Sequence, residues 1–287
     1  MASRSARVLI DAHSVQAVDH LWAPARRRRR LSAFIEIIES LGDCRVEPAA
    51  NRFGLFGPTP RLARWFAAEL LPKVVRRAQV PLSADQLAAC DLLIVTTRFP
   101  TFPYSAGEIA AIERFVERGG ALLLMANHSR EKAGSRRFDF VTQDARLAAV
   151  FGVKLLEARF RSDGALTVLT RASSPPHASL CDASGRRVVE AVAVGNCCAV
   201  SSDSAGSPIL FLNGDMFDLG PHCLSPSGQL FGVAIDQPRP GHGRVAVLAD
   251  SGFIGEPDAP AGGPGLLEHC DNRAFVRELV AWLLERK

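Results

Sequence analysis

The chain has 287 residues, of which 47% are hydrophobic and 22% charged, and this excludes an intrinsically disordered chain. The formal net charge of +4 is too small to indicate a nucleic-acid partner. Seven cysteines without a C-x-x-C motif predict a reducing compartment and buried, inert thiols. The apolar stretch before Asp11 is too short for a signal peptide, and no run approaches the ~18 residues of a membrane span. We therefore expect a cytoplasmic protein.

In the first half of the chain, short apolar runs alternate with amphipathic stretches, which is the pattern of a parallel sheet covered by helices. Ser105 and Glu108 form a capping box at the start of one helix, and Gly119-Gly120 ends it. Strands are predicted at 6–10, 44–48, 91–97 and 121–125, and helices at 31–41, 60–78 and from Ser105 to Gly119.

The second half has a different pattern. Residues 142–152 predict a short helix, and 153–207 contain short β-type runs separated by turn signals. We interpret 153–207 as a β-rich antiparallel insertion in a single domain that spans 1–287. The remaining elements are predicted as strands at 208–213 and 243–249, a Gly/Pro-rich loop at 255–265 and a final helix capped by Asp271 or Asn272.

Four segments, at 8–14, 91–129, 147–153 and 243–284, resemble the class I glutamine amidotransferase-like superfamily. The resemblance is to a branch of uncharacterised bacterial domains. That branch is similar to the N-terminal domain of an intraflagellar-transport subunit and to the soluble domain of a gliding-motility transporter subunit. The most specific signal pairs E-x-x-A-I-x-x-F-V-E-R-G-G-A-L-L-L with a later G-R-V-A-V-L-A-D-S. The resemblance implies an α/β fold with a flavodoxin-like, doubly wound, mainly parallel sheet.

The resemblance carries no catalytic residue to this chain. Amidotransferases of the family place a cysteine on a sharp turn within G-x-C-x-G, whereas the comparable turn here, 125–129, has neither the cysteine nor the glycines. A late His-x-Glu pair is also absent, and no G-x-S-x-G or phosphate loop occurs. Relatives in this branch are chiefly assembly modules or have no assigned activity, so the resemblance implies a non-catalytic role.

Polar residues follow four of the predicted strands. The carboxyl ends of parallel strands meet at one edge of the sheet, and ligands bind outside that edge. Asp and His there could hold a metal or act as a general base, and Asp or Asn could instead cap the next helix. The candidate ligand-binding residues are Asp11, His13, Arg98, Asn127, His128, Asp250 and Ser251.

The run Arg26–Arg30 allows three interpretations: contact with phosphate or an acidic membrane surface, contact with an acidic protein, or a solvated loop. We favour the solvated loop, because most charge runs are solvated.

The sequence predicts a ligand-binding or assembly module that works with a protein partner or a small molecule and needs no cofactor. The alternative is a hydrolase, metal-assisted in one version, that uses Asp11, His13, His128 and Asp250.

Overall fold

The computed structural model describes residues 5–11, 31–42, 44–48, 82–98, 103–129, 141–162, 167–170, 175–202, 206–236, 240–255 and 266–285. Its elements in chain order are β1 (Ala6–Ile10), α2 (Ser32–Glu39), β2 (Cys44–Pro48), α5 (Ala84–Ala88), β3 (Leu92–Thr96), α6 (Ala106–Glu117), β4 (Ala121–Met125), α7 (Val141–Val150), β5 (Val153–Arg161), β6 (Thr167–Thr170), η1 (Ala178–Leu180), β7 (Ala191–Val194), β8 (Cys197–Ser202), β9 (Ser207–Phe211), β10 (Phe217–Asp218), β11 (Leu230–Ile235), β12 (Val245–Leu248), η2 (Gly252–Ile254) and α8 (Asn272–Leu283).

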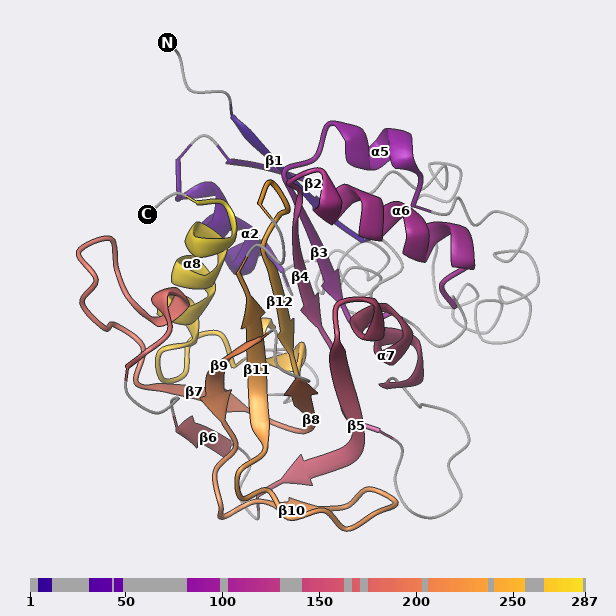
Figure 1. Ribbon diagram of the computed structural model, residues 1–287. Helices are drawn as coiled ribbons and strands as arrows, with labels where there is room; N and C mark the ends of the chain where they lie inside the picture. Colours follow the sequence, from indigo (N-terminus) through magenta and orange to yellow (C-terminus); the bar gives the residue numbers. More distant parts are fainter. Residues whose placement is uncertain are drawn as a thin grey trace, which may run out of the picture.

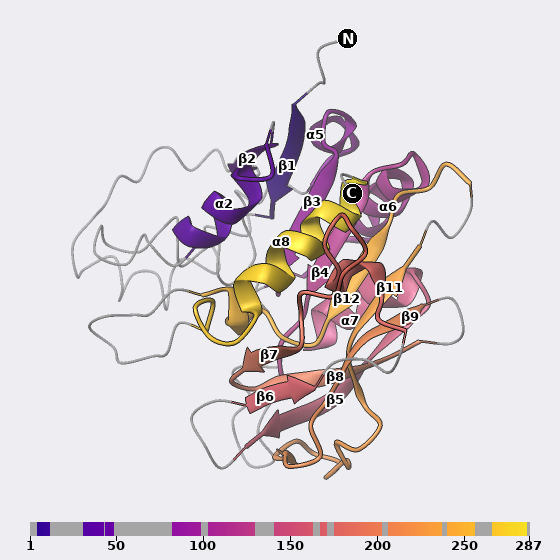
Figure 2. The same cartoon turned by 90° about the vertical axis from the view of Figure 1, so that its left-hand side faces the viewer.

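A ten-stranded sheet runs through the described part of the chain, in the order β10-β5-β8-β11-β12-β4-β3-β1-β2, with β9 paired to β11. The strands from β12 to β2 are parallel to one another, and their order is that of a flavodoxin-like sheet. Helices α2 and α8 lie on one face and α5, α6 and α7 on the other (Figure 1, Figure 2). The prediction of a doubly wound, mainly parallel sheet is therefore confirmed.

The centre of the core is formed by β3 and β4. Every residue of both strands is buried, because helices cover both faces of the parallel part of the sheet. Burying each large aliphatic side chain contributes roughly 1.5–3 kcal/mol. This explains why these strands have continuous apolar sequences rather than alternating ones.

The capping box of α6 forms as predicted: the Ser105 hydroxyl accepts from the Glu108 N–H, and Glu108 accepts from the Ser105 N–H. The glycine pair after the helix has a packing reason. A Cβ on Gly120 would lie 2.0 Å from the ring of Phe115, and one on Gly243 would lie 2.0 Å from the Gly120 carbonyl oxygen. The Gly243 N–H also donates to the Val116 carbonyl at 2.7 Å. The two most specific sequence segments thus meet through their glycines.

The region predicted as an antiparallel insertion divides in two. Strands β5 and β8 continue the main sheet: β5 pairs antiparallel with β8, and β8 pairs antiparallel with β11. Strands β6 and β7 form a separate two-stranded sheet. Strand β11, which joins the two halves of the sheet, was not predicted. Its central Gly232 weakens the strand pattern, and the structure explains the glycine: a Cβ there would lie 2.6 Å from the Leu248 side chain. The short helix α5 was also not predicted.

The prediction that the side chain of Asp271 or Asn272 caps α8 is wrong. Asp271 occupies the N-cap position but makes no capping hydrogen bond; its carboxylate accepts from the N–H groups of Glu190 and Ala191 at 2.7 and 3.1 Å. Asn272 bonds Ala193 and Leu266. Cys223 and Cys270 are exposed, which corrects the expectation that every thiol is buried.

Several predicted features lie outside the described residues: the helix at 60–78, the run Arg26–Arg30, His13 and most of the loop at 255–265. Within the described part, no helix combines the length and the apolar character that a membrane span needs.

Candidate functional site

The parallel strand order reverses between β1 and β3, and in sheets of this kind that crossover is where ligands bind. Asp11 follows β1 and Arg98 follows β3 at this point. The Arg98 Nε donates to Asp11 Oδ2 at 3.0 Å, and neither side chain is more than 1% exposed. The crossover is therefore occupied by an ion pair between two of the predicted residues.

Arg98 has further partners around the same point. Its Nη1 donates to Glu108 Oε1 at 3.0 Å, its backbone N–H donates to Asp144 Oδ1 at 3.0 Å, and its guanidinium lies 4.0 Å from the ring centre of Tyr104. Burial alone would lower the pKa of Arg98, but the neighbouring Asp11, Tyr104 and Glu108 outweigh it and raise that pKa. The guanidinium is thus held as a buried cation.

Asp144, Tyr104 and the second role of Glu108 were not predicted. Burial raises the pKa of Asp144 well above its ordinary value, although the Arg98 N–H partly opposes this, and burial raises the pKa of Tyr104 as well. The sequence did carry a signal, because Asp144 shares the buried face of α7 with Val141, Leu147 and Ala148.

Thr97 connects three strand ends. Its hydroxyl donates to the Met125 carbonyl at the end of β4 and lies 2.9 Å from the hydroxyl of Ser251, which follows β12. Its φ of 68° is in the left-handed region, where a β-branched residue is strained. This left-handed conformation turns the chain so that Thr97 and Arg98 both face the interior, where both are fully buried.

The Asp250 carboxyl hydrogen-bonds within the turn that follows it. Its Oδ1 accepts from the Gly252 N–H at 2.8 Å, at the start of η2, while Oδ2 has no partner among the described residues. Burial raises the pKa of Asp250 to about 7. Burial likewise raises the pKa of the Cys197 and Cys198 thiols, and the Asp250 carboxyl adds to this. These two thiols are therefore held in the protonated, unreactive form.

Asn127 and His128 are half-buried after β4. Asn127 Oδ1 accepts from the His128 N–H at 2.8 Å, and His128 Nδ1 lies 2.8 Å from the Ser129 carbonyl oxygen. A carbonyl only accepts, so Nδ1 carries the proton and Nε2 is the basic nitrogen of the neutral ring. Residues 126–129 have no positive φ, in contrast to Thr97.

The structure brings the predicted residues together in pairs. Asp11 contacts Arg98, and Ser251 contacts Thr97. Asn127 bonds His128, and Asp250 bonds Gly252, so these contacts of the described residues stay within the turns after β4 and β12. Within the described ranges, no group of three His, Cys, Asp or Glu side chains is arranged to hold a metal ion. The described arrangement fastens the strand ends to one another.

Comparison with solved structures supports the fold. The N-terminal domain of mmIFT52 matches with a TM-score of 0.60 and 13% identity, over 96% of this chain and 97% of that one. A cytoplasmic protein of Salmonella typhimurium LT2 matches with a TM-score of 0.56 and 12% identity, over 96% and 99%. A glutamine amidotransferase from Thermotoga maritima is more distant, with a TM-score of 0.47 and 9% identity, over 99% and 100%.

No protein-family model matches the sequence, and no curated protein matches it. At such low identities, the structural likeness concerns the fold and not the activity. The chain is therefore similar in fold to the mmIFT52 N-terminal domain and to the Salmonella protein.

Proposed function

We propose that this chain is a non-catalytic assembly domain of the amidotransferase-like fold, which acts by binding a partner protein. One observation carries the proposal: the Arg98–Asp11 ion pair lies at the crossover between β1 and β3, where a sheet of this order would hold a ligand. A partner protein is then contacted elsewhere on the surface.

The chemistry of the neighbouring groups supports the same proposal. The turn after β4, at 125–129, has no cysteine where amidotransferases carry one. The Asp250 carboxyl accepts from the turn that follows it, and the Thr97 and Ser251 hydroxyls contact each other. We take residues 1–287 as one domain, because β5 and β8 of the insertion extend the parallel sheet.

Two measurements on the full chain test this proposal. The first is turnover of ester, amide, phosphoester and glutamine substrates, with and without added divalent cations. The second is the mass of the complex that contains the tagged chain, purified from its own cells after cross-linking. We expect no turnover above buffer, and a complex heavier than the 30.9 kDa of one chain.

Turnover that falls in His128→Ala or Asp250→Asn would replace the proposal with the hydrolase alternative. A chain that remains a monomer in its own cells and shows no turnover would also contradict an assembly role. His13, which lies outside the described residues, is tested in the same assay as His13→Ala.

A further inference from the structure

We propose that the open edge of β5 at residues 153–157, with the hollow between β5 and α7, binds an extended segment of a partner protein in which acidic and apolar residues alternate. The inference rests on the proposed function, because it names the surface through which that binding occurs.

The outer edge of β5 makes backbone hydrogen bonds to other described segments along only half of its length. Near its end, β10 pairs with Phe160 and Arg161, and the Ala158 and Arg159 carbonyls accept from the Ser129 and Leu219 N–H groups. From Val153 to Glu157, by contrast, β8 is the sole strand partner within the described ranges. Every second residue of an edge strand turns its N–H and C=O away from its partner, so this stretch offers hydrogen bonds to a further strand.

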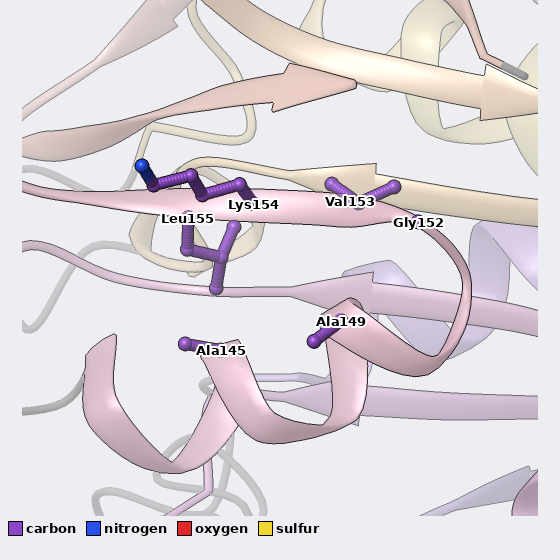
Figure 3. Close-up of a pocket in the computed structure, with 6 residues that line it drawn as sticks. All are labelled: Ala145, Ala149, Gly152, Val153, Lys154 and Leu155. Carbon is purple, nitrogen blue, oxygen red and sulfur yellow. The ribbon is translucent and has the colours of Figure 1, made fainter. Parts of the chain in front are cut away.

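A hollow of about 180 Å³ lies beside this edge. It is lined by Ala145, Ala149, Gly152, Val153, Lys154 and Leu155. In Figure 3, Leu155 points from β5 toward α7, where Ala145 and Ala149 lie one turn apart, and Lys154 leaves the strand on the opposite side. Small residues on α7 create this space. A cavity of roughly 150 Å³ accepts a benzene ring, so one large apolar side chain fits here.

The charge of the exposed residues on β5 determines which polar residues the bound segment should carry. Lys154 is exposed and has no ion-pair partner within the described ranges, and Arg161 at the far end of β5 is likewise exposed and unpaired there. An added strand turns alternate side chains to opposite faces of the sheet. Its apolar residues would therefore enter the hollow beside Leu155, and the residues between them would lie beside Lys154, where a carboxylate is favoured.

The same charges disfavour a second copy of this chain. Among the exposed side chains of β5, Lys154 and Arg161 outnumber Glu157, which pairs with His222 at 3.6 Å. Lysine on an edge strand commonly prevents pairing with a second copy of the same strand. A foreign acidic strand removes the conflict.

The probe is a seven-residue labelled peptide in which four glutamates alternate with valine, phenylalanine and valine. Binding to the full-length chain is followed by fluorescence anisotropy, and hydrogen exchange of the β5 amides reports the place of binding. We expect saturable binding and slower exchange at 153–157. Ala149→Trp, which fills the hollow from an exposed helical position without adding charge, and Lys154→Glu should each weaken binding by at least about tenfold.

Arg118→Glu is the matched control, because it makes the same charge change at an exposed position just after α6 and should leave binding unaltered. A peptide methylated at every backbone nitrogen and one with lysine in place of glutamate should both fail to bind. The inference is overturned if no saturable binding occurs, if Ala149→Trp binds as tightly as the unaltered chain, or if the edge pairs with a second copy and the chain dimerises.

The complex purified from cells separates this inference from the proposed function. If Ala149→Trp and Lys154→Glu remain in a complex of unchanged mass, the surface is wrong and the assembly role stands. If the unaltered chain forms no complex, the assembly role itself fails, whatever the peptide does.

Discussion

The parallel and antiparallel halves of the sheet place their polar groups in different environments. In the parallel half, Asp11, Thr97, Arg98 and Asp144 are fully buried and bonded within the chain. In the antiparallel half, Lys154, Glu157 and Arg161 of β5 are exposed, and part of the backbone edge of β5 faces outward within the described ranges. Helices cover both faces of the parallel strands, so a polar group there must find a partner inside the protein. The polar groups of the parallel half are thus used to hold its own strand ends together, and the partner binding that we propose uses the antiparallel half.

The largest effect is expected from a substitution that breaks the buried network of the parallel half. Arg98→Met leaves the Asp11 and Glu108 carboxylates buried without their cation, which should lower the free energy of unfolding by about 3–5 kcal/mol in urea denaturation. Arg186→Met removes a surface ion pair with Asp182 and should change stability very little. Equal losses in the two variants would contradict the assignment of Arg98 as the structural centre of the crossover.

The next effect concerns Asp250 and depends on pH. Its pKa is raised to about 7 in the folded chain, so folding favours the protonated carboxyl, and stability should fall as the pH rises from about 4 to about 7. Asp250→Asn keeps an oxygen for the Gly252 N–H and should remove this slope. Its advantage over the unaltered chain should reach at most about 4 kcal/mol above pH 7.

Unfolding titrations at pH 4, 6 and 8 measure this advantage, with the exposed Asp85→Asn as the control. An advantage that does not grow with pH would mean that the Asp250 carboxyl is ionised without cost.

A packing prediction compares glycines of the two halves. Gly243→Ala should cost about 2–3 kcal/mol, because its Cβ would lie 2.0 Å from the backbone carbonyl oxygen of Gly120. Gly214→Ala in the antiparallel half meets open space and should be nearly neutral. Thermal and urea unfolding of both variants test this, and a tolerated Gly243→Ala would show that the glycine contact is loose.

The smallest effect concerns the strand-to-helix contact made by Asp271. Asp271→Ala removes two hydrogen bonds to the N–H groups of Glu190 and Ala191 and should cost about 1 kcal/mol. Asp271→Asn retains an acceptor and should recover most of the loss. If Asp271 acted as a helix cap instead, Asp271→Ser would also restore stability, because serine is an effective N-cap.

Much of the fold could be predicted because local patterns and tertiary packing agree in the parallel half. The strand at 121–125 and the capping box at Ser105 were predicted at their observed positions, since apolar runs and caps depend on neighbours a few residues away. Strand β11 could not be predicted in this way. Its Gly232 is explained only by the side chain of Leu248, which lies on another strand.

The sequence by itself determined which polar residues end the parallel strands, and so placed Asp11, Arg98 and Ser251 at one edge of the sheet. Only the tertiary structure decided what they do there. The carboxyl groups of Glu108 and Asp144 reach Arg98 from two different helices. Local sequence patterns do not predict such contacts, because they relate only residues that are close together in the chain. Burial then fixes the outcome, because a charge removed from water must be paired within the protein, and the pairing with Asp11 occupies the crossover.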